Sequence, residues 1–198
     1  GGIHAKIRGD VEFKNVSYRA DDEDIVMDIN FKVKAGQTVG IIGSTGSGKS
    51  TLMNLLCRFY DTTNGEVLVD GVDVRKRDLY NLRDNIGMAM QDVFLFSDTI
   101  EGNIAYGRPD CSFEAVKHAI VGERGVGLSG GQKQRISLAR ALLKDPSILI
   151  LDDTTSAVDM ETESYIQKQL KNIQQEKDCT VFIIAYRISS IKDSDMIL

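Results

Sequence analysis

The sequence predicts an α/β fold, in which a parallel β-sheet alternates with helices and an antiparallel piece stands at the N-terminus. Short continuous apolar runs at 38–42, 148–151 and 180–185 are typical of strands that are buried on both faces. Segments with helical spacing separate these runs, and strands that alternate with helices favour a parallel sheet. Near the N-terminus, apolar and polar residues alternate, which is typical of half-buried antiparallel strands.

Length and composition are those of one ordinary globular domain. The 198 residues are 42% hydrophobic and 27% charged, which excludes a disordered tail, a fibrous repeat and a collagen-like chain. With 24 basic and 29 acidic residues the formal charge is −5, and no basic tract is present, so we expect no nucleic-acid partner. The longest apolar runs are far shorter than the ~20 residues that cross a bilayer, and nothing at Gly1 resembles a cleavable signal. We therefore expect the chain by itself to be soluble.

The cysteines predict neither a disulfide framework nor a metal site. Cys57, Cys111 and Cys179 are odd in number and lack the spacing of metal ligands. We expect reduced thiols, as in a cytoplasmic compartment, and assign them no role.

The first half of the chain predicts strands on either side of one glycine loop. Residues 11–18 alternate with a slip in the middle and residues 29–33 alternate again, and such runs suit an antiparallel hairpin. The buried run 38–42 enters the glycine loop, and a helix is predicted after Ser50 from the spacing of Leu52, Leu55, Leu56 and Phe59. Further short strands are predicted at 66–70 and 86–91.

The second half predicts helices between buried strands. A short helical pattern at 113–120 is followed by a run with three glycines. A long helix is expected from about Ser129 to Asp145, just before Pro146. The apolar face of this helix would carry Ile136, Ala139 or Arg140, and Leu143. The remaining predicted elements are a strand at 148–151, a helix at 160–177 and a strand at 180–185.

Residues 43–50 match the pattern G-x-x-x-x-G-K-S/T between a predicted strand and a predicted helix. A phosphate chain needs a ring of backbone N–H donors and a mobile cation, and glycines let the backbone approach without a Cβ clash. We expect Lys49 to reach the β- and γ-phosphates and the Ser50 hydroxyl to bind Mg²⁺. The alternative is a simple glycine turn with a helix cap. The predicted nucleotide-binding residues are Gly43, Ser44, Thr45, Gly46, Ser47, Gly48, Lys49, Ser50 and Thr51.

Two carboxylates, Asp152 and Asp153, directly follow the buried strand 148–151. Open α/β folds bind ligands at the carboxyl edge of the sheet, where this strand ends. We expect Asp152 to hold Mg²⁺ through water and Asp153 to lie beside an attacking water. The alternative is a strand end with solvated acids, which is common for one Asp but is disfavoured for this pair together with a phosphate loop.

A glycine-rich segment opens the long helix, with the residues Leu128, Ser129, Gly130, Gly131 and Gln132. Taken alone, it is equally an N-cap serine followed by a glycine turn. Together with the phosphate loop and the carboxylate pair, it resembles the signature motif of ATP-binding cassette (ABC) proteins. The resemblance covers essentially the whole chain, because the Q-loop position holds Gln91 and the D-loop position holds Ser156, Ala157, Val158 and Asp159. Residues 121–125 are similar to the X-loop of ABC exporters.

The resemblance implies the ABC ATPase fold. This fold has a P-loop NTPase parallel-sheet core, an N-terminal antiparallel β-subdomain and a helical signature subdomain. One nucleotide-binding domain would span 1–198, with its core at 1–91 and 136–198 and its helical subdomain at 92–135. The transmembrane domain of such a protein is absent from these residues.

The resemblance also implies an ATPase that binds ATP and Mg²⁺, with Ser50, Gln91 and Asp152 as metal ligands and Gln91, Asp153 and Tyr186 at the catalytic positions. Two such domains would pair head to tail. The start of the helix after Ser129 is an anion-binding surface that needs a phosphate held by another molecule. The implied partners are a second nucleotide-binding domain and the coupling helices of a transmembrane domain, at the cytoplasmic face of the cell membrane.

Three positions depart from the family pattern. The family usually carries Glu after the first aspartate of the strand end, where this chain has Asp153. A family histidine is replaced by Tyr186, and the adenine-stacking tyrosine falls on Ala20. Tyr18 would belong to the nucleotide site if a shifted loop brought its ring to the base. We favour the alternative, in which Tyr18 packs in the strand.

These departures resemble the degenerate half of a heterodimeric, multidrug-type ABC exporter. An Asp withdraws the carboxylate by about one C–C bond of ~1.5 Å relative to Glu, and a phenol cannot carry positive charge toward a phosphate. We expect slow hydrolysis at this site. The different partner subunit would supply Glu and His.

The helical lobe between Phe113 and Val121 is shorter than in exporters. Either the lobe is trimmed, or a stretch is absent between Ile120 and Val121, and we favour the second because this lobe seats the coupling helices. The chain stops at Leu198 as if inside a strand, so we interpret it as an excised domain whose membrane portion lies upstream of Gly1.

Three other classes of protein are considered. A soluble ABC ATPase of the DNA-repair or translation type is disfavoured by the acidic balance, by Glu123 and Arg124, and by the exporter-like residues 94–97 after Gln91. A nucleotide-sensing interaction module without turnover stays open, because the three departures suit it. A phosphate-loop kinase or GTPase is disfavoured by the signature segment.

Overall fold

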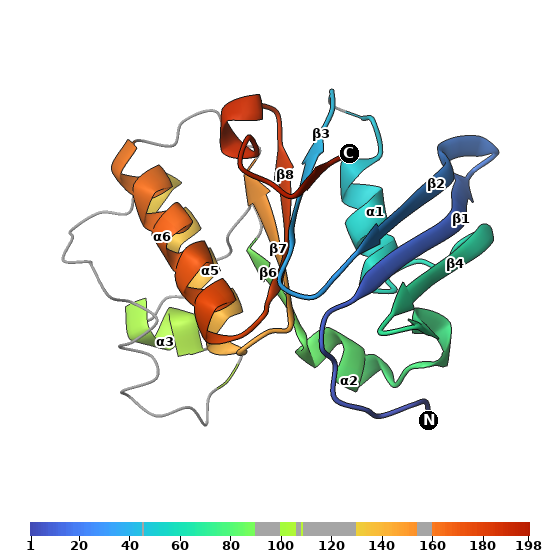
Figure 1. The fold of residues 1–198 in the computed structure, drawn as a ribbon, viewed down its shortest axis with the longest axis horizontal. Helices are drawn as coiled ribbons and strands as arrows, with labels where there is room; N and C mark the ends of the chain where they lie inside the picture. The colour runs from blue at the N-terminus through green and yellow to red at the C-terminus, as the bar shows by residue number, and fades with distance from the viewer. Residues whose placement is uncertain (45, 90–99, 106–107, 109–129, 154–159) are drawn as a thin grey trace.

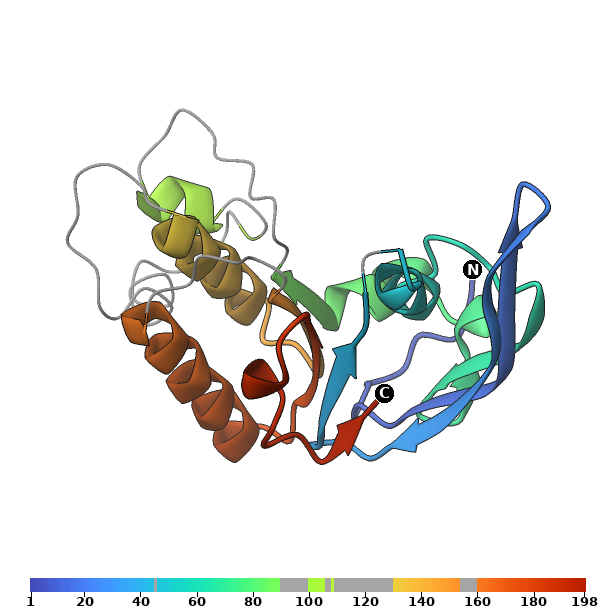
Figure 2. The same ribbon diagram turned by 90° about the horizontal axis from the view of Figure 1, so that it is seen from above.

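The fold consists of two β-sheets with helices between and beside them (Figure 1). The computed structural model describes residues 1–44, 46–89, 100–105, 108, 130–153 and 160–198. One sheet has the strand order β2-β1-β4-β5, and the other has the order β6-β7-β8-β3-β9. Figure 2 shows the second sheet between the pair α5 and α6 on one side and α1 with the first sheet on the other.

The first sheet is antiparallel and begins with the predicted hairpin. The pairing of β1 with β2 shifts after Phe13, after Val16 and after Tyr18, and the first of these shifts falls where the sequence slips. β4 pairs with the other edge of β1, which the alternation alone did not indicate. The strands are β1 (Val11–Ala20), β2 (Glu23–Val33), β4 (Asn64–Val69) and β5 (Val72–Asp73).

Every pairing recorded in the second sheet is parallel. Its strands are β3 (Thr38–Ile42), β6 (Ile86–Ala89), β7 (Ile148–Asp153), β8 (Thr180–Ala185) and β9 (Met196–Ile197). The predicted runs at 38–42 and 180–185 coincide with β3 and β8, and β7 includes both aspartates that follow the predicted run. The α/β fold class with an antiparallel N-terminal sheet is therefore confirmed.

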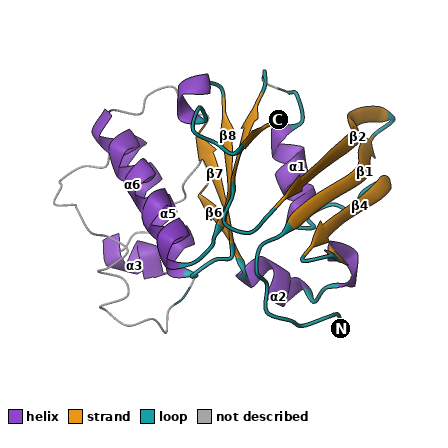
Figure 3. Cartoon of the chain, viewed as in Figure 1, coloured by secondary structure: helices purple, strands orange, loops and turns teal. Residues whose placement is uncertain are grey.

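The predicted helices after the glycine loop, from about Ser129 and at 160–177 are present, whereas α2 and α3 were not predicted (Figure 3). The helix after the glycine loop ends at Leu56, and Arg58 takes the left-handed backbone angle φ +54°. Phe59 was predicted on this helix, but it lies beyond the helix end and is 50% exposed. The helices are α1 (Lys49–Leu56), α2 (Leu79–Asp84), α3 (Ile100–Ala105), α5 (Gly130–Leu143) and α6 (Met160–Glu176), with 3-10 turns at Val74–Lys76 and Ile188–Ser190.

Alternate residues of the central strands point into two separate cores. Ile148, Ile150 and Phe182 pack in a core with α1 and the antiparallel sheet. Leu149 and Val181 pack in a second core with α5 and α6. Since successive side chains of a strand point to opposite faces, a strand between two cores must be apolar throughout. This explains the continuous apolar runs in the sequence.

Two buried side-chain hydrogen bonds join the N-terminal segment to the parallel sheet. The Thr180 hydroxyl donates to the Gly9 carbonyl at 2.6 Å, and the Ser147 hydroxyl donates to the Ile7 carbonyl at 2.7 Å. At Gly9, where φ is +120°, a Cβ atom would lie 2.7 Å from the Thr180 Oγ1. Only glycine fits this close approach, which ties the segment before β1 to the start of β8.

The predicted helix at 113–120 and most of the predicted helical subdomain lie outside the described residues. α3 and the start of α5 are the parts of that subdomain that the structure describes, and α5 begins at Gly130 as the glycine-rich segment predicts. Among the described helices, none combines the length and the apolar character that a membrane crossing requires.

We expect the thiols of Cys57 and Cys179 to be unreactive in the native domain. The two residues are 1% and 0% exposed, and burial raises the pKa of each thiol to about 12. The thiolate is the reactive form, so at pH 8 both groups stay protonated. In a Cys111→Ser variant, a thiol reagent such as DTNB should react with neither cysteine at pH 8 and with both in guanidinium chloride. Fast native labelling of either cysteine would contradict this burial.

Candidate functional site

Three neighbouring parallel strands end side by side at one edge of the sheet. β3 pairs with β8 so that Ile42 faces Ala185, and β7 pairs with β8 so that Asp153 faces Ala185. The segments that follow this row of residues are forced to the same edge. The glycine loop follows Ile42, and Tyr186 follows Ala185. Asp152 lies one residue before the end of β7. This is the edge at which open α/β sheets bind ligands.

The glycine loop requires glycine at position 48, directly before α1. Gly48 caps α1 with φ +88°, and a Cβ atom there would lie 2.7 Å from the Val26 side chain and 3.1 Å from the Ile25 carbonyl oxygen. Gly46 also has a positive φ of +80°, although a Cβ atom at this position would meet nothing within 4 Å. The requirement at Gly48 is thus both conformational and steric, because β2 packs directly on the helix start.

The N-terminus of α1 is available to an anion. No side chain caps the helix, and its first turn carries no acidic residue. The first N–H groups of a helix have no acceptor within the helix, and the helix dipole adds positive potential there. Ser50 and Thr51 lie in this first turn, so their backbone N–H groups point toward the space in front of the helix.

Lys49 is folded back onto its own loop. Its ammonium group donates to the carbonyl oxygen of Ser44 at 2.7 Å and to that of Gly43, with the Ser47 hydroxyl at 3.4 Å. The ammonium nitrogen also lies 4.7 Å from the centre of the Tyr186 ring. Lys49 is only 8% exposed, because the loop and the Tyr186 ring surround it.

These groups surround one open hollow of about 350 Å³. Its walls come from the glycine loop, the first turn of α1, and the ends of β7 and β8. The described residues that line it are Ile25, Gly46, Ser47, Gly48, Lys49, Ser50, Thr51, Asp152, Ile184 and Tyr186.

The oxygen donors in this hollow suit Mg²⁺. Ser50 and Asp152 both line it, and Asp152 is 7% exposed. Within the described ranges, no group of three or more His, Cys, Asp or Glu side chains converges on a metal position. Mg²⁺ is usually bound by one or two protein oxygens together with phosphates and water, so a dedicated cage is not required. The donor set fits a magnesium ion that arrives with a phosphate chain.

The structure brings most of the predicted phosphate-binding residues together, but not Tyr18. The Tyr18 ring stacks on the ring of Tyr60, with 5.4 Å between centroids and 28° between planes. Tyr18 packs against the core and is not among the described residues that line the hollow.

Some of the predicted residues are described only by their backbone, and others lie outside the described residues. Only the backbone is described for Gly130, Gly131 and Gln132 at the start of α5 and for Asp153 at the end of β7. The predicted residues that lie outside the described ranges are Thr45, Gln91, Leu128, Ser129, Ser156, Ala157, Val158 and Asp159.

Sequence reasoning missed two apolar residues of the hollow, Ile25 and Ile184. Ile184 sits on a strand that was read only as core. Ile25 comes from β2, and no local pattern indicates that this strand reaches the glycine loop. The glycine at position 48 was the indirect signal, since its need for space comes from Ile25 and Val26.

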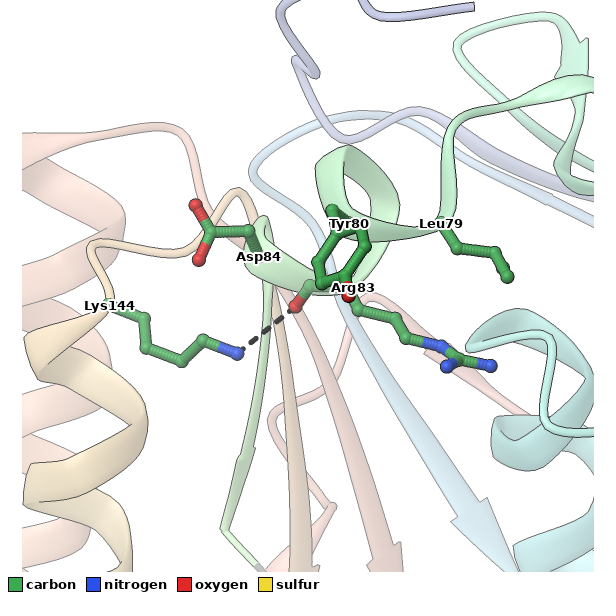
Figure 4. A pocket seen from close by; sticks show the side chains of 5 residues that line it. All are labelled: Leu79, Tyr80, Arg83, Asp84 and Lys144. Carbon is green, nitrogen blue, oxygen red and sulfur yellow. Dashed lines mark hydrogen bonds between the residues drawn. The ribbon is translucent and has the colours of Figure 1, made fainter. Parts of the chain in front are cut away.

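A second hollow of about 380 Å³ lies where α2 meets the end of α5 (Figure 4). Leu79, Tyr80, Arg83, Asp84 and Lys144 line it. The Lys144 ammonium donates to the carbonyl oxygens of Arg83 at 3.1 Å and Ile86 at 3.3 Å, which ties the end of α5 to α2 and β6. Tyr80 is 87% exposed at the rim.

An adjoining hollow extends the second hollow toward the end of α1. It shares Arg83 and Lys144 with the second hollow and adds Phe59, Met88 and Arg140 among its lining residues. The Arg83 guanidinium lies 4.9 Å from the centre of the Phe59 ring and donates to two carbonyls beyond the end of α1. We call this continuous surface the α2–α5 groove.

The chain matches a family described as ABC transporter over residues 26–156. One relative is the Bacillus subtilis protein YgaD, whose name assigns it to multidrug export as an ATP-binding/permease protein. It is 48% identical over 214 residues, which cover 98% of this chain and 37% of the relative. Another is an ATP-dependent lipid A-core flippase of Haemophilus influenzae, 44% identical over 213 residues, with 96% of this chain and 36% of the relative covered.

A solved structure of similar fold is that of a bacterial Atm1-family ABC exporter with ATP bound. It superposes with a TM-score of 0.90 at 39% identity, covering 100% of this chain and 38% of the other. The chain thus spans a little over a third of the length of the proteins that it matches. The ABC ATPase fold expected from the signature, the phosphate loop and the carboxylate pair is confirmed, and the chain belongs to the ABC transporter family as an ATPase domain of the exporter type.

Proposed function

We propose that this chain binds MgATP, pairs head to tail with a second nucleotide-binding domain, and couples ATP hydrolysis to export at the cytoplasmic face of the cell membrane. The observation that carries the proposal is the single hollow shared by Lys49, Ser50 and Asp152. The exporter relatives support the coupling to a transmembrane domain, since this chain covers only the ATPase part of their length.

The polar groups at and beside the hollow have distinct tasks in this proposal. Lys49 leaves its loop carbonyls and binds the β- and γ-phosphates, and the N–H groups at the start of α1 donate to the phosphate oxygens. Ser50 and Asp152 would hold Mg²⁺, with Gln91 as the third ligand that the family resemblance implies. When bound, Mg²⁺ would supply positive charge beside the phosphate oxygens. Asp153 orients the attacking water and accepts its proton.

The second half of the phosphate cradle comes from another molecule. The helix α5 begins at Gly130, so the backbone N–H groups of Gly130 and Gly131 stand at the positive end of a 14-residue helix dipole. An anion binds favourably there, but the chain's own hollow lies at a different helix start, that of α1. ATP held by one domain therefore bridges to the signature segment of its partner.

We propose that this site is degenerate and that the productive site lies on a different partner subunit. Asp153 and Tyr186 stand at the ends of β7 and β8, where the family resemblance implies Glu and His. A shortened carboxylate reaches the water poorly, and placement of a general base contributes about 10²–10⁴-fold in rate, or about 3–5 kcal/mol of barrier. The intact signature segment would complete the partner's site. An ATP-dependent interaction module without turnover is the alternative at this site.

The double substitution Asp153→Glu with Tyr186→His should raise the ATPase rate of the chain. We expect an increase of at least about tenfold, toward the 10²–10⁴-fold range of general-base catalysis, if these two positions limit turnover. Steady-state phosphate release at saturating MgATP measures it. The control adds Lys49→Ala to the double variant, which should abolish the increase. A wild-type chain as fast as the double variant would contradict the degenerate site.

We propose that the α2–α5 groove receives the coupling helices of the transmembrane domain. It combines apolar surface from Tyr80 and Phe59 with the charged heads of Arg83 and Lys144 at its floor. Exposed large aromatic side chains beside charged groups are typical of protein interfaces. The similarity to an ATP-binding/permease protein and to a lipid A-core flippase favours a membrane partner over a soluble ABC ATPase of the repair or translation type.

The substitution Tyr80→Ser should uncouple ATP hydrolysis from transport without destabilising the domain. Tyr80 is 87% exposed, so we expect less than about 0.5 kcal/mol of change in stability and unchanged MgADP affinity for the chain. In the full-length exporter, the variant should lose transport and any stimulation of ATPase activity by the membrane domain. The matched control is Met27→Ser, which removes an apolar side chain that is 65% exposed on β2. Equal transport by both variants would overturn this docking surface.

We also propose that the helical subdomain spans 92–135 and lacks a stretch near 120–121. The alignments with the relatives run over 212 to 216 residues although the chain has 198, so the relatives have positions without a counterpart here. This supports an internal shortening of the chain.

A further inference from the structure

Tyr186 stands where the family resemblance implies a histidine, and its ring contacts the lysine of the phosphate loop. The Lys49 ammonium nitrogen lies 4.7 Å from the ring centre. The contact does not depend on a long loop, because Tyr186 directly follows Ala185, which is paired with Ile42 at the end of β3. Strand register therefore brings the ring to the loop.

The ammonium group is shared between the ring and the loop itself. It donates to the carbonyl oxygens of Gly43 and Ser44, and the aromatic face attracts the charge through its quadrupole. The arrangement leaves Lys49 at 8% exposure, whereas Tyr186 is 48% exposed. The ring thus covers the lysine, and water reaches the ring more than the cation.

A phosphate chain must compete with this arrangement. Tyr186 and Lys49 line the same hollow as Ser50 and Asp152, so a phosphate that binds the ammonium enters the space beside the ring. A neutral imidazole offers a weaker aromatic face, and an imidazolium repels the lysine. The tyrosine ring therefore favours the position of Lys49 against its loop more than the family's histidine would.

We propose that Tyr186 is a positioning residue that holds Lys49 against its loop in the nucleotide-free domain and so weakens nucleotide binding. The ring carries the effect, not the hydroxyl. The inference rests on the proposed ATP site and adds a reason for this position that is separate from slow hydrolysis. It predicts a change in affinity even for ADP, which is not turned over.

Calorimetric titration of the 198-residue chain with MgADP tests the proposal. Tyr186→Phe keeps the ring and should bind as the wild type does. Tyr186→Leu removes the ring, keeps an apolar side chain, and should bind about two- to fivefold more tightly, as expected for one exposed cation–π contact. Circular dichroism checks that both variants fold, which the exposure of Tyr186 favours. Equal affinity of the Phe and Leu variants, or weaker binding by Leu, would overturn the proposal.

A second readout does not depend on nucleotide. The ring current of Tyr186 should shift the NMR resonance of the Lys49 ε-methylene group in the wild type and in Tyr186→Phe. The shift should disappear in Tyr186→Leu and when MgADP is added to the wild type. An identical resonance in the wild type and in Tyr186→Leu would contradict the contact. If no form of the chain bound MgADP, the proposed function would fail, and with it the effect on affinity, whereas this shift would still report on the contact itself.

Discussion

The in-register ends of three parallel strands determine the chemistry of this domain. Ile42, Ala185 and Asp153 form one row across β3, β8 and β7, so whatever residue follows each strand stands at the same edge. Lys49, Asp152 and Tyr186 line one hollow there, although the lysine precedes the other two by more than a hundred residues in the chain. A slip of one position in any strand would exchange the two faces of the sheet and scatter the site.

Two hydrophobic cores on opposite faces of the parallel sheet stabilise this register. Phe182 and Val181 are neighbours in β8, are both fully buried, and belong to different cores. Full burial of one such side chain contributes about 1.5–3 kcal/mol, so a slipped strand would exchange well-packed side chains on both faces at once. The hydrogen bonds from Thr180 and Ser147 to the N-terminal segment add a fixed link to the antiparallel sheet. That sheet in turn places Ile25 beside the glycine loop.

The sequence predicted the strands and helices that carry strong periodicity, and it singled out most of the residues that line the hollow. Runs that are apolar throughout, such as 180–185, identify β8 because only a strand between two cores has that composition. Phe59 was misplaced because helical spacing continued past Leu56, although the left-handed turn at Arg58 ends the helix path. Contacts made by tertiary approach had no local signal. Ile25 in the hollow, β4 beside β1, and the Tyr186 ring over Lys49 all depend on how distant segments pack.

The described hollow supplies donors for one side of a triphosphate, and the rest of the account requires the second set to come from another molecule. Mixing two inactive variants tests this most directly. One variant carries Asp153→Glu and Tyr186→His with a blocked signature, Ser129→Arg, and the other carries Lys49→Ala with an intact signature. We expect neither to hydrolyse ATP alone, and the mixture to recover activity, because one composite site is complete. A silent mixture, or full activity of the blocked-signature variant alone, would contradict the account.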